Sequence, residues 1–480
     1  MRVSSTRSGS LPPATSESAR CEALRAACAG ILDAHGFIPG DQADERYCTD
    51  WSGARGHPLA VLRPRDTQEV SRTLAILHEL NQPVVVQGGG TGLVGACVPQ
   101  PGEAVLSLER LRTIEEIDPL SATATVQAGV CLQTLQQAVE AQGLYFPVDI
   151  GSRGSCQIGG IVATNAGGNR VLRYGMTRQS VLGLEVVLPD GRVVTRMGKV
   201  LKDNAGFDLK QVFIGSEGCL GVITRVLLAL QPLPTGRHSA LVAVQGFEAV
   251  LALLTECRRR LGPRLSSFEV MWRDFYDIST GLLKKGLPGL QLAGSHVVLV
   301  EAAGYEPAAD EALFADALAG FEQGQSGCEV VLAQSLMQAQ QLWAIRDAAG
   351  EAARAMSPCV GFDVSLPLAG MAAWVDQTHQ RLRAMGLTRT QTYGHLGDGN
   401  LHLLVGLTQE AGISDRVNEL VYAGVGALGG SISGEHGIGL SKKAYLHHNR
   451  SVSEIELMKQ LKTALDPRSL LNRGRIFDMS

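Results

Sequence analysis

The segment from Gly88 to Gly102 constrains the fold of this chain more than any other stretch of its sequence. A short apolar run, residues 83–87, leads into GGGTGLVGA, which holds five glycines between Gly88 and Gly95. Such a density of glycines lets successive backbone N–H groups converge on one anion, because no Cβ atoms stand in the way. A diphosphate is the natural occupant, so the sequence predicts a loop that holds a nucleotide-like group.

The same loop formally matches a different pattern. Gly90, Gly92 and Gly95 have GxGxxG spacing, and Glu109 follows at roughly the 20 residues where a ribose-binding acid would stand. That dinucleotide-binding unit needs a long helix that begins in the loop. Pro99 and Pro101 follow instead, and proline removes an N–H and clashes with the preceding helical turn. We therefore expect no NAD-type Rossmann unit here.

Length and charge exclude several classes of protein. At 480 residues the chain is too long for one ordinary core and predicts two or three domains. Its net charge of −4 argues against nucleic acid as the main partner, because such binding needs a basic face. It contains no run of about 18 uncharged apolar residues, so no membrane span is expected. The ten cysteines form no CxxC pair, which fits reduced thiols.

The first twenty residues are rich in Ser and Arg. That composition is typical of a mitochondrial transit peptide, but no amphipathic helix can be drawn, which favours a disordered tail. We expect a cytoplasmic protein, or one of the mitochondrial matrix if this segment is a transit peptide.

Hydrophobic patterning divides the rest of the chain. A helix is expected over 17–37, and residues 40–58 read as polar and irregular. A strand from Ala60, a helix over Thr67–Leu80 and the strand at 83–87 form a βαβ unit, which predicts a parallel pair of strands. Pro189-Asp-Gly predicts a hairpin turn. The expected division is 1–57 tail and helix, 58–234 first domain, 235–440 second α+β domain and 441–480 helical segment.

Two further glycine clusters stand at 151–168, with IGGIVATNAGG, and at 213–224, with FIGSEGCLGVIT. Together and in this order, the three clusters resemble the flavoprotein superfamily of vanillyl-alcohol oxidase and p-cresol methylhydroxylase. The resemblance implies an α+β fold: a two-subdomain FAD-binding domain, then a cap domain with an antiparallel sheet, and a C-terminal helical segment that returns to the FAD domain.

The resemblance also implies which residues contact FAD. The first loop would bind the pyrophosphate, and the second cluster would run along the ribityl chain and the isoalloxazine. Many superfamily members attach FAD through a histidine in the first loop, but this chain has no histidine between His78 and His238, so non-covalent FAD is expected. The implied cofactor residues are Gly88, Gly89, Gly90, Thr91, Gly92, Asp149, Gly159, Gly160, Thr164, Asn165, Gly167, Gly168, Glu217, Gly221, Ile223 and Asn472.

A third constellation lies near the C-terminus. YGHLGDGNLH places His395 and His402 in and after a glycine turn, and SGEHG brings Glu435 and His436 some thirty residues later. A pair of histidines is often only structural. Imidazoles and a carboxylate in glycine-rich turns also suit Zn²⁺ or a related divalent ion.

These two motifs resemble the signatures of D-2-hydroxyacid dehydrogenases in the same superfamily, among them D-2-hydroxyglutarate dehydrogenase, D-lactate dehydrogenase and the flavoprotein component of glycolate oxidase. The resemblance spans about 58–475. It implies that His395, His402 and Glu435 hold a metal and that His436 is the general base. It also implies that Arg346 pairs with the substrate carboxylate, although a helix-surface salt bridge is the alternative for that residue.

The chain departs from the D-2-hydroxyglutarate dehydrogenases at three positions. Gly350 stands where they commonly have threonine, Gly361 where they have the lysine for the distal carboxylate, and Leu404 where asparagine is frequent. We therefore expect a monocarboxylic substrate such as D-lactate, glycolate or a longer 2-hydroxyalkanoate. D-2-hydroxyglutarate bound by a divergent site is the alternative.

Electrons would pass from the reduced flavin to an electron-transfer flavoprotein, a quinone or a cytochrome, and a homodimer is expected. Two other classes stay open. A zinc hydrolase would use the same His/Glu cluster but leaves the glycine clusters unexplained. A non-catalytic flavin- or metal-binding subunit of a larger complex would explain why the residues for a distal carboxylate are missing.

Overall fold

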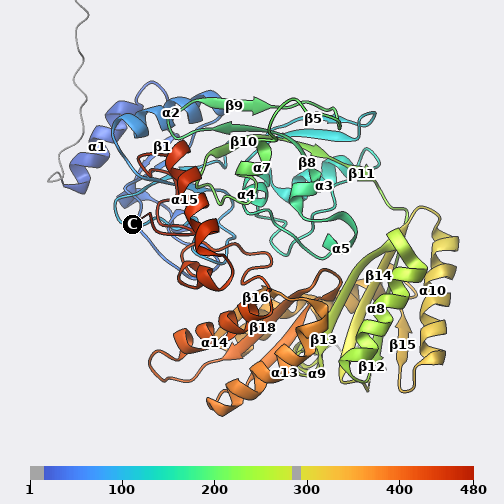
Figure 1. The fold of residues 1–480 in the computed structure, drawn as a ribbon. Coiled ribbons are helices and arrows are strands. Elements are labelled where there is room, and N and C mark those ends of the chain that lie inside the picture. Colours follow the sequence, from blue (N-terminus) through green and yellow to red (C-terminus); the bar gives the residue numbers. More distant parts are fainter. Residues whose placement is uncertain (1–15, 284–292, 480) are drawn as a thin grey trace, which may run out of the picture.

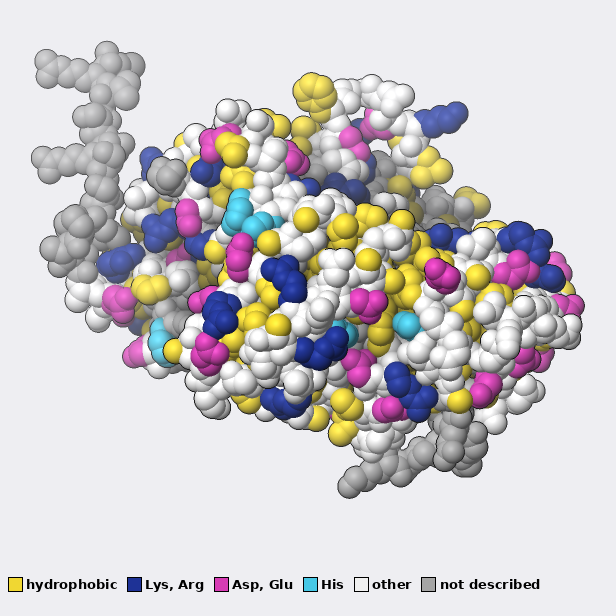
Figure 2. Space-filling view, turned by 60° about the horizontal axis from the view of Figure 1, so that its bottom comes forward, with side chains coloured by type: hydrophobic (Ala, Val, Ile, Leu, Met, Phe, Trp, Pro, Cys, Tyr) yellow, Lys and Arg dark blue, Asp and Glu magenta, His cyan; other side chains and the backbone are white. Residues whose placement is uncertain are grey.

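The computed structural model describes residues 16–283 and 293–479. Most of the Ser- and Arg-rich N-terminal segment, whose composition is typical of a transit peptide, therefore lies outside the described residues. Figure 1 shows two bodies, one built from the N-terminal half together with the C-terminal helix, the other from residues in between. On the face drawn in Figure 2, basic and acidic side chains are interspersed. In the described ranges, no helix is both long enough and apolar enough to cross a membrane.

The first sheet contains the predicted βαβ unit. Asp66 accepts a hydrogen bond from the N–H of Glu69 and so caps the helix between its strands. The strands before and after that helix are parallel, as expected, but they are not neighbours, because the third parallel strand pairs with both. The N-terminal helix ends at Cys28, before the predicted end, since Gly30 adopts φ +83°. The elements are α1 (Glu17–Cys28), β1 (Phe37–Pro39), β2 (Ala60–Leu62), α2 (Thr67–Glu79), β3 (Val84–Gln87) and β4 (Ala104–Ser107), in sheet order β1-β2-β4-β3.

The second sheet is antiparallel and has five strands, in the order β5-β6-β10-β8-β9. The predicted turn at 189–191 joins β8 and β9 as a hairpin. Short helices cover its inner face, and a buried apolar core lies between them. The elements are β5 (Ile114–Asp118), β6 (Thr123–Gln127), α3 (Leu132–Glu140), β7 (Leu144–Tyr145), α4 (Ile158–Ala163), α5 (Val171–Tyr174), α6 (Thr177–Ser180), β8 (Val181–Val187), β9 (Val193–Arg196), α7 (Lys210–Phe213), β10 (Val222–Ala229) and β11 (Gln231–Pro232).

The third sheet has seven antiparallel strands, in the order β15-β12-β14-β13-β17-β18-β16, with helices on both faces. Along β12, Ala240 and Val242 belong to one core, whereas Leu241 and Ala243 belong to the other. The sequence pattern missed β13, because a strand buried on both faces shows no clear alternation. It also missed α9, β15 and β17, and the residues up to His395 form a strand rather than the expected loop. The elements are β12 (Gly236–Val244), α8 (Phe247–Leu261), β13 (Leu265–Trp272), α9 (Arg273–Leu283), β14 (His296–Gly304), α10 (Pro307–Gly324), β15 (Glu329–Leu332), α11 (Leu336–Asp347), α12 (Ala349–Ala355), β16 (Cys359–Ser365), α13 (Leu368–Ala384), β17 (Thr390–His395), β18 (Asn400–Gly406) and α14 (Ile413–Ala427).

The C-terminal segment returns to the first body, as predicted. Helix α15 (Val452–Leu465) begins with a capping box of Ser451 and Glu454 and ends before Pro467. Beyond it, the buried Arg475 pairs with Glu103 at 2.6 and 2.8 Å and donates to the carbonyls of Ala96 and Val98 at 3.2 and 2.6 Å. The tail thus holds the far side of the long glycine loop in place.

Candidate active site

A cavity runs between the glycine clusters of the first body and ends against the loop that follows α14. Its walls come from all three clusters that the sequence singled out, and its end is formed by Glu435 and His436. Segments separated by hundreds of residues therefore share one cavity. Its lining includes Trp51, Gly88, Gly89, Gly90, Thr91, Gly92, Leu93, Gln157, Gly159, Gly160, Thr164, Gly167, Glu217, Gly221, Ile223, Glu435, His436 and Asn472.

The first loop has the chemistry of an anion site. Among the described residues, the N–H groups of 89–93 donate to no protein acceptor, so they are available to a phosphate. Gly90 has φ +68°, which glycine adopts without strain. A Cβ at Gly160 would meet no atom within 4 Å outside its own stretch of helix, and the Oε1 of Gln157 in the same wall is buried without a partner. These features fit a diphosphate cofactor such as FAD.

Thirteen of the sixteen residues expected to contact FAD line this cavity, and three do not. Asp149 forms ion pairs with Arg170 and Arg153 instead. Gly168 packs so closely on the Asp149 carbonyl that a Cβ would lie 1.9 Å from its oxygen. Asn165 accepts the N–H of Arg178 at 2.9 Å. Their contact with the cofactor stays a prediction.

Glu217 and Asn472 join the cavity to the rest of the molecule. Glu217 accepts the N–H groups of Ile438 and Gly439 at 2.7 and 2.8 Å, and burial raises the pKa of its carboxyl. Asn472 accepts the N–H of Val86 at 2.8 Å and donates to the Glu217 carbonyl at 2.6 Å. The two side chains therefore tie β3 and the C-terminal tail to the loop that carries Glu435 and His436.

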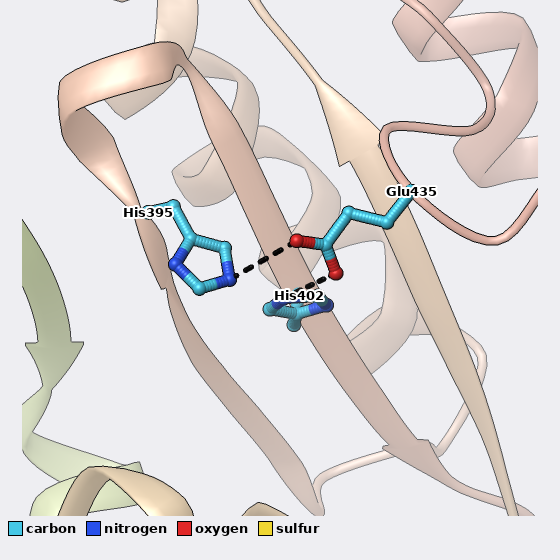
Figure 3. A group of neighbouring side chains, drawn as sticks. All are labelled: His395, His402 and Glu435. Atoms are coloured by element: carbon cyan, nitrogen blue, oxygen red, sulfur yellow. Dashed lines mark ion pairs between the residues drawn. The ribbon is translucent and has the colours of Figure 1, made fainter. Parts of the chain in front are cut away.

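The structure brings the three predicted metal ligands together (Figure 3). Ligand atoms of His395, His402 and Glu435 all lie within 4.8 Å of one another. The Glu435 carboxylate is 3.4 Å from Nε2 of His395 and 4.0 Å from Nε2 of His402. His395 ends β17 and His402 stands on the adjacent β18, which explains why a seven-residue separation gives neighbouring rings. Two imidazoles and a carboxylate fit a divalent metal.

Glu269 on β13 is the central residue that the sequence reading missed. It is 1% exposed. Its carboxylate accepts a hydrogen bond from Nε of Arg346 at 2.8 Å and another from Nδ1 of His395 at 2.9 Å. A carboxylate at Nδ1 fixes the tautomer that leaves Nε2 free for a ligand. Burial disfavours the charged ring, but the Glu269 charge outweighs it and raises the pKa of His395 to about 9. Burial instead holds the pKa of His402 well below its usual range.

Arg346 is buried, which excludes the alternative that it forms a salt bridge on the surface of a helix. Besides Glu269 it contacts Nε2 of His395 through Nη2 at 2.9 Å, and its guanidinium lies over the Tyr393 ring. The structure therefore places Arg346 directly beside the candidate metal ligands.

Asp363 on β16 organises the loop that carries Glu435 and His436. One of its oxygens accepts the N–H groups of both residues at 3.0 Å and lies 3.5 Å from Nδ1 of His436. Lys442, also buried, lies 3.6 Å from the same oxygen. Burial raises the pKa of Asp363, but the charges of His436 and Lys442 outweigh burial and hold it well below the usual range. Asp363 and Glu269 share a signal visible in the sequence: each is a lone carboxylate inside an apolar strand.

Fold and site together define a FAD-dependent oxidoreductase of the two-domain p-cresol methylhydroxylase type. The model of the "FAD binding domain" matches residues 58–196, and that of "FAD linked oxidases, C-terminal domain" matches 233–476. The chain belongs to this family of FAD-linked oxidases, and it is an oxidoreductase that acts on CH–OH donors, like its D-2-hydroxyacid dehydrogenase relatives.

Three curated relatives illustrate the similarity. D-2-hydroxyglutarate dehydrogenase of Bos taurus, a mitochondrial protein, is 40% identical over 88% of this chain and 78% of its own length. The D-2-hydroxyglutarate–pyruvate transhydrogenase of Saccharomyces cerevisiae is 35% identical over 91% and 90%. A putative mitochondrial D-lactate dehydrogenase of Schizosaccharomyces pombe is 38% identical over 90% and 84%. Among solved structures, p-cresol methylhydroxylase shares the fold, with a TM-score of 0.75 and 17% identity over 98% of this chain and 99% of its own.

Proposed function

We propose that this protein oxidises a small monocarboxylic D-2-hydroxy acid to the 2-oxo acid with the help of a divalent metal. The observation that carries the proposal is the placement of Glu435 and His436 in the wall of the flavin cavity, with His395 and His402 beside Glu435. A substrate at this end of the cavity would meet ligand groups, a histidine and the cofactor at once.

His395, His402 and Glu435 would hold Zn²⁺ or another divalent ion. Three protein ligands leave open positions, at which a bound ion would acidify a substrate hydroxyl. Nη2 of Arg346 lies 2.9 Å from Nε2 of His395, the atom that an ion would also need. Ion binding therefore requires the guanidinium to leave that atom, while Glu269 keeps the Arg346 Nε contact.

His436 would take the hydroxyl proton. Its side chain is about one-third exposed toward the cavity, and Asp363 holds its backbone N–H and faces its Nδ1. A neutral imidazole so oriented is a suitable general base. Arg346 would bind the substrate carboxylate with N–H groups not taken by Glu269. The flavin, when bound, supplies the acceptor for the Cα hydride.

The face of β18 that carries His402 supports a substrate with one carboxylate. Gly361 pairs with Leu404 in the same register that pairs Asp363 with His402, so Leu404 and His402 lie on one face of β18. Leu404 is buried in a core with Tyr393. A second carboxylate placed near Leu404 would lose its hydration without a cationic partner, at a cost of several kcal/mol.

D-2-hydroxyglutarate remains a second candidate, because several curated relatives carry that substrate in their names. Comparison of kcat/KM for D-lactate and D-2-hydroxyglutarate decides between the two. We expect the monocarboxylate to win. A tenfold preference for the diacid would reject the monocarboxylate proposal while leaving the oxidation itself in place.

Anaerobic bleaching of the flavin by D- and L-2-hydroxy acids tests the reaction. His436→Ala should keep bound FAD but lose bleaching by at least 10²-fold, the usual contribution of a general base. A chelator should suppress bleaching, and added Zn²⁺ should restore it. Wild-type bleaching by the variant would refute the role of His436, and indifference to the chelator would refute the metal.

FAD is proposed to be bound without a covalent link through the first loop, since residues between His78 and His238 include no histidine. Release of free FAD on acid precipitation would agree with this. An external acceptor, either an electron-transfer flavoprotein, a quinone or a cytochrome, is proposed to reoxidise the flavin. The homodimer and the placement in the cytoplasm or mitochondrial matrix are likewise kept as proposals.

A further inference from the structure

We infer that Trp51 closes the cofactor cavity by stacking on an aromatic ring of bound FAD. Trp51 lies in the cavity wall next to Gly88–Leu93, yet 57% of its surface is exposed. The other three tryptophans of the chain are at least partly buried. Trp51 precedes residue 58, where the match to the FAD-binding model begins. The inference rests on FAD binding and is independent of the substrate.

The backbone around Trp51 is held rigidly against the glycine loop. Asp50 is 5% exposed and accepts the N–H of Gly95 at 2.9 Å with one oxygen and the N–H of Ser52 at 2.9 Å with the other. Thr49 donates its hydroxyl to the carbonyl of Ala54 at 2.8 Å, which closes the turn. The indole is therefore presented to the cavity from a fixed turn rather than from a free loop.

The chemistry of the position favours stacking over other roles. A half-exposed tryptophan in a cavity wall offers a large apolar ring that is still in contact with water. FAD carries two flat aromatic systems, adenine and isoalloxazine, on either side of a pyrophosphate that the 89–93 N–H groups can bind. Leu93, 41% exposed, also lines the cavity next to the loop. Burying Trp51 on either ring would remove this apolar surface from water.

Hydroxyl-radical footprinting, read by peptide mass spectrometry on FAD-stripped protein, tests the inference without any activity measurement. FAD should reduce the labelling of Trp51 at least threefold. Leu201 and Phe207, which are 84% and 96% exposed and do not line the cavity, should be labelled equally with and without FAD. Protection by ADP would assign the adenine ring, and protection by FMN the isoalloxazine. Unchanged labelling of Trp51 when FAD is bound would overturn the inference.

Matched variants give a second measurement. Trp51→Ala removes the ring that would stack on FAD and should raise the Kd for FAD about tenfold. Trp51→Phe keeps a ring and should stay within threefold of wild type, as should the surface control Leu201→Ala. An unchanged Kd for Trp51→Ala would refute stacking. If that variant fails to fold, the footprint of the wild-type protein still decides. Failure of the wild type to bind FAD would instead contradict the cofactor itself.

Discussion

At the scale of single residues, two buried carboxylates in this protein each orient residues of the candidate active site. Glu269 is shared between Arg346 and His395, and Asp363 serves the backbone of Glu435 and His436. An unpaired buried carboxylate would be costly, so each of these acids depends on the groups that it orients. The same contacts that stabilise the fold thus set the tautomer and direction of the site histidines.

His296 is a buried titratable group without such a role, and it predicts a pH dependence of stability. It packs edge-to-face against Trp272 and Phe247, and burial lowers the pKa of His296 to about 4, with a smaller opposing effect from Asp376. Because the unfolded chain binds the proton more readily, this residue reduces the free energy of unfolding as pH falls from about 6.5 to 4, by up to about 3 kcal/mol.

His296→Phe keeps the ring and should remove that part of the acid sensitivity. Urea unfolding at pH 7 and near pH 4 measures the difference between variant and wild type. The variant should gain stability relative to wild type only at the acid pH. Equal pH slopes for the two proteins would contradict the prediction.

At the scale of elements, a substitution in helix α4 should affect the stability of the protein and its affinity for FAD in opposite directions. Gly160 lies in this helix and in the cavity wall, and a Cβ built there meets no atom within 4 Å outside its own stretch of helix. Gly160→Ala should stabilise the FAD-free protein slightly, since alanine in a helix interior is favoured over glycine by up to about 1 kcal/mol. The methyl group would intrude on the cofactor, so the Kd for FAD should rise tenfold or more.

Gly281→Ala is the matched control for that variant. Gly281 also lies in a helix, α9, with open space around its Cβ, but it is not in the cavity wall. The control should show a similar stability and an unchanged Kd. Equal FAD affinity of Gly160→Ala and wild type, measured by fluorescence titration of the stripped proteins, would show that the cofactor does not reach α4.

Elements also show what could be predicted from the sequence. The glycine clusters indicated the cofactor loop and the fold, because a backbone that closely approaches a ligand requires glycine, which is visible in the sequence. The His395–His402 pair was visible for a similar reason, since a short turn joins two adjacent strands. Glu269 could not be placed, because its contact with His395 spans 126 residues and its strand shows no alternation. Likewise, β4 enters between β2 and β3, an order that local pattern does not determine.

At the scale of the whole molecule, charged side chains join distant parts. Arg170 forms ion pairs with Asp149 in the first body and with Glu301 on β14 in the second. Arg475 joins the C-terminal tail to Glu103, and both side chains are fully buried. The cofactor cavity thus depends on contacts that no single domain can make alone.

Arg475→Met should show this dependence. It leaves the buried Glu103 without its cationic partner, which typically costs about 3–5 kcal/mol, and it frees the carbonyls of Ala96 and Val98 at the end of the glycine loop. We expect a lower temperature of FAD release, followed by flavin fluorescence on heating. The double variant Glu103→Gln/Arg475→Met removes both charges and should recover part of the loss. A single variant that releases FAD at the wild-type temperature would disprove the coupling.

The Arg475–Glu103 contact also bears on the order of events while the chain is synthesised. The two residues are 372 positions apart, so during synthesis the glycine loop leaves the ribosome long before its clamp exists. In that interval the loop lacks the hydrogen bonds that Arg475 donates to the carbonyls of Ala96 and Val98. We therefore expect cofactor capture in this protein to be a late event of biosynthesis, after the segment that carries Arg475 has been made.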